Sequence, residues 1–240
     1  MPFQPNARPI PGAVATVGVD ERMRFIRKVY VHLFFALMAF VGLLYAWEQT
    51  QFAEDFTIWV ATSGRWSWLL VLLGFMVVSF LADRWSHSNT SSAVQYLGLA
   101  VYVVAESIIF IPLIHIAAHY SDPSVLPNAA LLTSVLFVGL TGTVFIMRKD
   151  FSFLRGFLAI GGMAALGIIL CGALFGFNLG LWFAVAMTVY AAGAVLYQTS
   201  QIMAHYRPTQ HVGAALGLFA AVALMLWYVI QIFMDLSSNR

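Results

Sequence analysis

A single carboxylate, Glu106, stands in the middle of a long apolar run that extends from Ser92 to Ala118. No other acidic residue lies so deep inside an apolar run of this chain. Ionisable groups in apolar surroundings are costly and commonly serve ion or proton pathways. Pro112 follows in the same run, where it removes a helical hydrogen bond and bends the helix. Glu106, Ser107 and Pro112 are therefore candidates for a polar path. The alternative is structural, with protonated Glu106 hydrogen-bonded to Ser107 or to a neighbouring helix.

A second polar group stands at the end of the apolar run Leu181–Ala204 and comprises Gln198, Thr199, Ser200 and Gln201. Gln198 and Gln201 share one side of a helix because they are spaced i,i+3. This spacing predicts that Gln198, Thr199 and Gln201 face the interior of a bundle and contribute to the same candidate path. The alternative is a set of interhelical hydrogen bonds that only stabilise the bundle.

Other kinds of chemistry have less support. The six histidines are His32, His87, His115, His119, His205 and His211. They are scattered along the chain, which predicts no metal site, because ligands must converge in space. The single Cys171 excludes an intramolecular disulfide and a cysteine-based metal site. Neither G-x-S-x-G nor H-E-x-x-H occurs. We therefore predict no enzyme, no catalytic residue and no cofactor. The remaining enzymatic alternative, with Glu106 as an intramembrane base, lacks a paired nucleophile.

The composition is that of a membrane protein. Hydrophobic residues make up 61% of the chain, charged residues only 9%, and the mean hydropathy is +0.86. Soluble domains contain about 25% charged residues. The net charge of +2 and the absence of a basic patch with interleaved aromatic residues exclude a nucleic-acid partner. The expected surroundings are membrane lipid.

Seven apolar runs are each long enough to cross a bilayer. They are Val29–Ala46, Trp66–Ala82, Ser92–Ala118, Val125–Met147, Phe151–Gly176, Leu181–Ala204 and Val212–Met234. These runs predict an all-α membrane protein, a seven-transmembrane-helix bundle. Of the 12 Lys and Arg residues, only Arg65 and Arg240 fall on the side opposite to the N-terminus. Basic residues favour the cytoplasmic side, so the predicted topology is N-in/C-out.

Three segments follow from these runs. Residues 1–28 are predicted to be a flexible cytoplasmic N-terminal tail, residues 29–236 the transmembrane domain, and residues 237–240 a short C-terminal tail. Residues 1–20 are rich in Pro, Gly and Ala and contain no apolar region typical of a signal peptide. In the loop before the fifth run, Lys149, Asp150 and Ser152 form a candidate helix-cap motif. Asp150 is expected to cap a helix that begins at Phe151.

Three motifs carry a resemblance to a known family. They are Arg148–Leu154 (RKDFSFL), Leu196–Ile202 (LYQTSQI) and Ala215–Phe219 (ALGLF), and from about Val29 onward the chain resembles the Bax inhibitor-1 (TMBIM) family. The resemblance includes the step Phe110-Ile111-Pro112. It implies a seven-helix bundle with the sixth or seventh helix near the centre. It also implies functions in ion leak, stress tolerance and suppression of cell death.

Two departures from the family pattern bear on function. In calcium-leak members an aspartate follows the Leu-Tyr pair and couples to a second aspartate in the last helix, and the two sense pH. Here these positions are occupied by Gln198 and Ala221, neither of which ionises. Arg84 is the candidate for the arginine that latches the pair. The pattern without the aspartates is more similar to the YccA-like bacterial branch, which is associated with the FtsH protease.

The residues and the resemblance together leave two non-enzymatic functions open. One is the modulation of a membrane partner, such as an FtsH-type protease, in membrane protein quality control or the stress response. The alternative is a cation leak for calcium or protons that lacks the pH-sensing aspartates. The resemblance and the distribution of basic residues predict an integral protein of the bacterial inner membrane with a cytoplasmic N-terminus.

Overall fold

Long apolar helices make up most of the chain. A computed structural model describes residues 12–87 and 91–238, except for the side chain of Arg65. In chain order the elements are the 3-10 turn η1 (Val14–Thr16) and the helices α1 (Val19–Glu48), α2 (Gln51–Thr62), α3 (Arg65–Ser86), α4 (Ser92–His119), α5 (Val125–Met147), α6 (Leu154–Phe175), α7 (Gly180–Ala204) and α8 (His211–Ser238). The described residues form no strand.

Seven of these helices, all except the short α2, are long and apolar enough to span a membrane. This confirms the predicted class, an all-α bundle with seven candidate spans. The outer surfaces of α3, α5 and α6 are strongly apolar and little buried within the bundle, as contact with lipid requires. The predicted last span, Val212–Met234, and the predicted end of the transmembrane domain at residue 236 both fall inside α8, which continues to Ser238.

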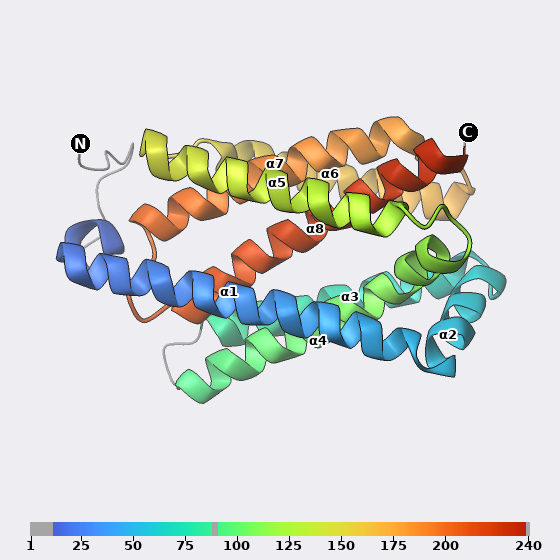
Figure 1. The fold of residues 1–240 in the computed structure, drawn as a ribbon, viewed down its shortest axis with the longest axis horizontal. Coiled ribbons are helices and arrows are strands. Elements are labelled where there is room, and N and C mark those ends of the chain that lie inside the picture. The colour runs from blue at the N-terminus through green and yellow to red at the C-terminus, as the bar shows by residue number, and fades with distance from the viewer. Residues whose placement is uncertain (1–11, 88–90, 239–240) are drawn as a thin grey trace.

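Helix α8 lies at the centre. It runs obliquely between a layer formed by α5, α6 and α7 and a layer formed by α1, α3 and α4 (Figure 1), and it packs against α1, α3, α4, α5 and α7. Phe219 on α8 packs edge to face against Phe40 on α1, which packs in the same way on Phe110 of α4. All three rings are buried, so they join three helices at the core. Edge-to-face pairs add about 0.5–1.5 kcal/mol each beyond area burial.

Helix α1 begins at Val19 rather than at the predicted Val29. Asp20 and Glu21 lie in its first turn, where negative charge complements the helix dipole. The basic segment that follows is helical because it has an apolar face, on which Phe25 and Val29 are buried. Hydropathy alone did not reveal these apolar residues, which are spaced one helical turn apart among the arginines.

The predicted N-terminal tail, residues 1–28, is therefore corrected over the part that the structure describes. Ala13 and Val14 are fully buried, and the Val14 amide donates a hydrogen bond of 2.9 Å to the carbonyl of Tyr206. Residues 12–28 thus pack on the bundle through η1 and α1. Residues 1–11 of the predicted tail lie outside the described residues.

The segment between the first two spans also differs from the predicted loop, because it contains α2. Ala53 and Thr57 are buried on one face of this helix, which packs against α1 and α4. The Thr57 hydroxyl donates to the Ala53 carbonyl, so this polar side chain is satisfied within the helix. The amphipathic pattern is short, and tertiary contacts stabilise it.

The cap motif before α6 also has a different role from the predicted one. Asp150 Oδ1 accepts a hydrogen bond of 2.8 Å from the Ser152 amide and stabilises a turn, so α6 begins only at Leu154. The Asp150 side chain is buried, and Oδ2 lies 3.9 Å from Nε2 of His205. Because the carboxylate is used in the turn, it does not cap a helix that begins at Phe151. Lys149 is exposed.

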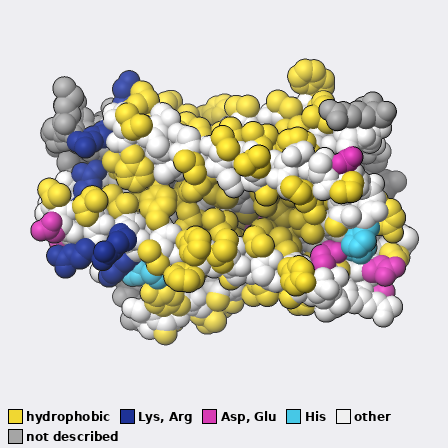
Figure 2. Space-filling model, viewed as in Figure 1, with side chains coloured by type: hydrophobic (Ala, Val, Ile, Leu, Met, Phe, Trp, Pro, Cys, Tyr) yellow, Lys and Arg dark blue, Asp and Glu magenta, His cyan; other side chains and the backbone are white. Residues whose placement is uncertain are grey.

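Charge divides the bundle into two ends. Most Lys and Arg side chains gather where α1 begins, whereas acidic side chains gather at the opposite end (Figure 2). We call the first the basic end; it includes Arg22–Lys28 and Arg148–Arg155. The second is the acidic end; it includes Glu48, Glu54, Asp55, Asp122 and Asp235. This asymmetry agrees with the pattern from which the topology is predicted.

Candidate functional site

Glu106 lies near the middle of α4 and is buried, with 6% of its surface exposed. The hydroxyl of Tyr102, one helical turn earlier, is a polar neighbour of its carboxyl group. The second carboxyl oxygen, Oε2, has no hydrogen-bond partner among the described residues. An unpartnered buried carboxyl oxygen costs free energy, so the fold holds this group in an unfavourable setting.

Glu106 lines a cavity of about 370 Å³ whose walls are almost entirely apolar. The walls come from α3, α4, α6, α7 and α8 and include Trp68, Phe75 and Trp227. A second cavity of about 590 Å³ lies toward the acidic end and shares Trp68, Ile169, Leu179 and Gln231 with the first. The two cavities therefore adjoin, and together they extend from the acidic end toward Glu106.

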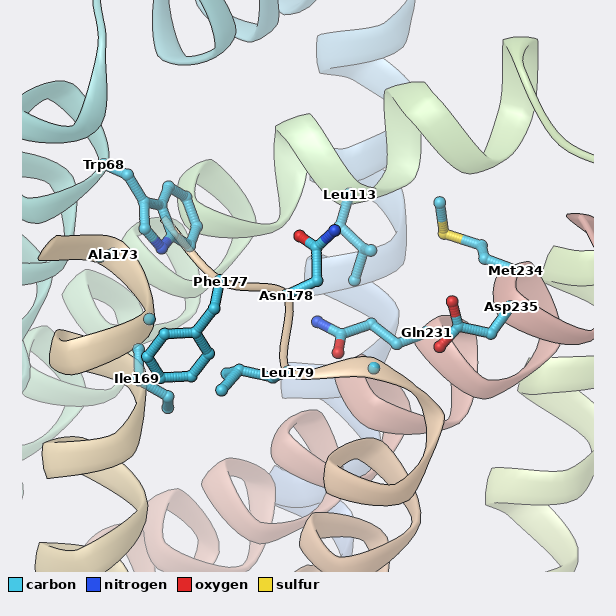
Figure 3. Close-up of a pocket in the computed structure, with 12 residues that line it drawn as sticks. Trp68, Leu113, Ile169, Ala173, Phe177, Asn178, Leu179, Gln231, Met234 and Asp235 are labelled. Atoms are coloured by element: carbon cyan, nitrogen blue, oxygen red, sulfur yellow. The ribbon is translucent and has the colours of Figure 1, made fainter. Parts of the chain in front are cut away.

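Polar side chains line the larger cavity (Figure 3). Asn178 reaches it from the turn between α6 and α7, whereas Gln231 and Asp235 reach it from the last turns of α8. Gln231 also lines the smaller cavity that contains Glu106. A cation or proton that enters at the acidic end would meet these three side chains before it reaches Glu106.

Ser107 and Pro112, the other candidates on α4, do not line these cavities. Ser107 Oγ donates to the Val104 carbonyl and accepts a hydrogen bond of 3.1 Å from Trp47 Nε1. Ser107 therefore joins α4 to the end of α1, and the structural alternative of a Glu106–Ser107 hydrogen bond is not what the structure shows. Pro112 is buried inside α4, which continues past it.

Gln198, the first substituted family position, lies near the basic end and is separate from the Glu106 cavity. A Cβ atom on Gly217 of α8 would stand 3.1 Å from the Gln198 amide group, so the side chain lies directly on the α8 backbone. The Tyr206 hydroxyl lies 3.5 Å from Gln198 Oε1 as a donor. Thr199 is fully buried, and Gln201 is half-buried. The structure therefore does not join the two polar groups into one site.

Ala221, the second substituted position, is buried on α8 one helical turn beyond Gly217. Arg84, the candidate latch, is exposed near the end of α3. The titratable pair beside this region is Asp83 and His87, whose Oδ1 and Nδ1 atoms are 3.3 Å apart. The Asp83 hydrogen bond raises the pKa of His87, against the opposing effect of burial. The His87 ring in turn stacks on Tyr206.

A third group, of side chains that can ligate a metal ion, was not predicted from the sequence. Glu48, at the end of α1, lies beside His115 and His119 of α4. The only local signal was the i,i+4 spacing of the two histidines, which places both rings on one helix face. The carboxylate comes from a distant part of the chain, so the spacing of histidines alone could not identify the group.

The chain is similar to known proteins over most of its length. The sequence pattern of the family described as "Inhibitor of apoptosis-promoting Bax1" matches residues 22–239. The protein named Bax inhibitor 1 of Schizosaccharomyces pombe is 25% identical over 234 residues, which cover 94% of this chain and 82% of that protein. An uncharacterized protein of Pseudomonas aeruginosa is 27% identical over 171 residues, covering 68% of this chain and 72% of that protein. An uncharacterized protein of Neisseria meningitidis serogroup A is 24% identical over 193 residues, covering 77% and 80%. With seven candidate spans and a family match over almost its whole length, the chain belongs to the Bax inhibitor-1 family of membrane proteins.

Proposed function

We propose that this protein is a non-enzymatic membrane modulator that acts on a partner such as a membrane-bound protease of the FtsH type. One observation supports this most directly. At the basic end, neutral side chains occupy the two positions where the resemblance implies aspartates in calcium-leak members. Gln198 lies on Gly217 and Ala221 is buried, so no ionisable pair stands at these positions. Without that pair, the coupled titration that would gate a leak with pH is missing.

The proposed setting is membrane protein quality control or the stress response in the bacterial inner membrane, with the basic end in the cytoplasm. In this orientation η1 lies on the cytoplasmic side, and the Pro- and Gly-rich sequence before it is the segment that we propose a protease engages. Segments rich in Pro and Gly suit such an interaction because they have little tendency to form a packed core of their own.

Co-purification tests this proposal. The full-length protein, extracted in mild detergent, is expected to retain an AAA-type protease identified by mass spectrometry. Deletion of residues 1–20 is expected to weaken the association, but it also removes the buried contact of Val14. Deletion of residues 1–11 keeps η1 and is the sharper test, with deletion of residues 237–240 as the matched control. Equal recovery of the protease from the 1–11 and the 237–240 deletion variants would show that the N-terminal segment does not bind it. If the intact protein recovers no protease, the proposed partner is wrong.

A cation or proton leak is the second candidate, and the unpartnered Glu106 Oε2 beside a cavity favours it. Liposomes loaded with a calcium-sensitive or pH-sensitive dye test it directly. If Glu106 carries the path, Glu106→Gln abolishes the flux, whereas the matched variant Asp235→Asn at the mouth of the larger cavity only reduces it. The first proposal instead expects little flux from the unmodified protein.

A further inference from the structure

Three metal-ligating side chains from two helices meet at the acidic end of the bundle. His115 Nδ1 lies 3.2 Å and His119 Nδ1 lies 3.8 Å from the same oxygen, Oε2 of Glu48. One ligand atom from each of the three residues lies within 4.8 Å of the others. We propose that Glu48, His115 and His119 form a binding site for a divalent transition-metal ion, with Zn²⁺ as the ion that the ligand set fits best.

The fold holds these residues together through two parallel helices. His32, near the middle of α1, contacts Tyr96 near the start of α4, and Glu48 contacts His115 near the ends of both helices. Trp47, beside Glu48, donates a hydrogen bond to Ser107 on α4, which fixes the last turn of α1 against α4. The i,i+4 spacing then directs both imidazoles of α4 toward the fixed carboxylate.

The electrostatic setting favours a cation. Glu48 is the last residue of α1, and His119 is the last residue of α4. Each helix C-terminus carries about half a negative elementary charge, which is unfavourable for an adjacent carboxylate and favourable for a positive ion. Glu48 is only 14% exposed, so water screens this repulsion poorly.

An independent observation also indicates a missing partner. Oε1 of Glu48 is buried and has no hydrogen-bond partner among the described residues, although Oε2 contacts both histidines. Carboxylate oxygens in such settings are normally satisfied, because burial without a partner costs about 1–3 kcal/mol. A metal ion bound by the carboxylate would neutralise this charge.

The ligand types fit zinc better than calcium or magnesium, and the distances are compatible with zinc. Atoms that ligate a tetrahedral zinc ion at about 2.0–2.1 Å lie about 3.3 Å from one another. The two separations from Glu48, 3.2 and 3.8 Å, lie within about 0.5 Å of this value. Calcium and magnesium prefer all-oxygen ligands, whereas imidazole nitrogens select zinc and its transition-metal neighbours. His119 is 54% exposed, so an ion can reach the site and water can complete the coordination.

The competing explanation is an ion pair between Glu48 and His115, with His119 bonded only to the backbone. His119 Nδ1 lies 3.1 Å from the His115 carbonyl, which is compatible with that arrangement. The two explanations differ in what they predict for His119. In an ion pair it contributes nothing to metal affinity, whereas in a metal site its loss removes one of three protein ligands.

Zinc titration of the full-length protein in lipid nanodiscs, without a polyhistidine tag, tests the proposal. In competition with a chromogenic chelator we expect saturable binding of a single ion per chain. Co²⁺ bound in its place should give the visible absorption bands of a tetrahedral site. The absence of saturable zinc binding to the unmodified protein would overturn the proposal.

Variants locate the site. Glu48→Gln, His115→Ala and His119→Ala should each weaken zinc binding by at least about 10-fold, since even groups outside the ligand shell have effects of this size. His119→Cys should restore binding and change the Co²⁺ spectrum, because thiolate is also a zinc ligand. The matched control removes only His211, whose ring lies beside Tyr96 near the other end of α4.

Folding is checked by thermal unfolding without zinc, and His119→Ala is the most informative variant because its side chain is mostly exposed. Unchanged affinity in folded His119→Ala, or loss of binding in the control but not in the ligand variants, would show that the site is elsewhere.

Discussion

The Gln198 amide lies directly on the backbone of Gly217, where a Cβ atom would stand 3.1 Å from it. Helices α7 and α8 therefore approach closely at the position where the resemblance implies an aspartate. The Tyr206 hydroxyl reaches the same amide, and the His87 ring stacks on Tyr206. Neutral polar and aromatic side chains thus pack around Gln198, and the ionisable pair of Asp83 and His87 lies beside them at the end of α3.

Restoring the acid pair tests whether this geometry is retained from the family. We expect Gln198→Asp combined with Ala221→Asp to introduce a pH-dependent calcium leak in liposomes, because two coupled carboxylates can share a proton. Either single change should instead strand a buried carboxylate and mainly destabilise the protein. The unmodified protein should show little pH-gated leak. A large leak in the unmodified protein that titrates at mildly acidic pH and persists in Glu106→Gln would contradict this expectation.

Close packing of α3 on α4 depends on Gly98. A Cβ atom there would lie 2.6 Å from the Ala82 carbonyl oxygen and 2.7 Å from the Ser86 amide nitrogen. Gly98→Ala should therefore destabilise the bundle by about 1–3 kcal/mol through overpacking against backbone that cannot rotate away. Gly74→Ala is the matched control, since a Cβ at Gly74 meets nothing within 4 Å. Thermal unfolding in detergent should separate the two variants, and equal melting temperatures would argue against the close α3–α4 contact.

Apolar length was sufficient to predict the seven spans, because backbone groups in a bilayer must be satisfied within each helix. The same signal missed the start of α1 and the whole of α2. There helix formation depends on buried faces, such as that of Phe25 and Val29, which exist only after the helices pack. The apolar run also predicted a helix start at Phe151. An aspartate before such a run can either cap a helix or stabilise a turn, and only the hydrogen bond from the Ser152 amide identifies the turn.

The candidate sites were predictable to different degrees. Glu106 was identified because one carboxylate in an apolar run stands out in any sequence. The cavity beside it was not, since its walls come from five helices. The joining of Glu48 to His115 and His119 depends on parallel packing of α1 and α4, and helix packing of this kind leaves no local pattern in a single sequence.

The pair of Asp83 and His87 predicts a pH dependence of stability. The pKa of His87 is raised in the folded protein by its hydrogen bond to Asp83, above the ordinary value of about 6.5. The pair therefore stabilises the fold fully below that ordinary value, and the contribution is lost as the pH rises through the raised value. Asp83 is 60% exposed, so the effect should be below about 1 kcal/mol. Melting curves between pH 5 and 9 should show a decline that His87→Gln and Asp83→Asn both flatten; an unaltered decline in both variants would exclude the pair.

The charge asymmetry of the two ends predicts topology. A reporter fused after Arg240 should be extracytoplasmic, and one inserted between Arg148 and Arg155 should be cytoplasmic, because short basic loops remain on the cytoplasmic side. Paired reporters with opposite compartment requirements, such as alkaline phosphatase and a fluorescent protein, provide the control at each site. A cytoplasmic C-terminus would refute the orientation with seven crossings.

Substitution of Glu106 separates a functional carboxyl group from a structural one. Its Oε2 atom is buried without a hydrogen-bond partner, and an apolar side chain of similar size would remove that cost. If the group is kept for function, Glu106→Leu should leave the melting temperature unchanged or raise it, as replacing buried polar groups by apolar ones often does. If the group is structural, Glu106→Leu should lower it by several degrees. Ser107→Ala is the neighbouring control and should be destabilising in either case, because it leaves Trp47 Nε1 without its acceptor. A destabilised Glu106→Leu beside an equally destabilised Ser107→Ala would assign Glu106 to the packing of α4 and remove it from the proposed ion path.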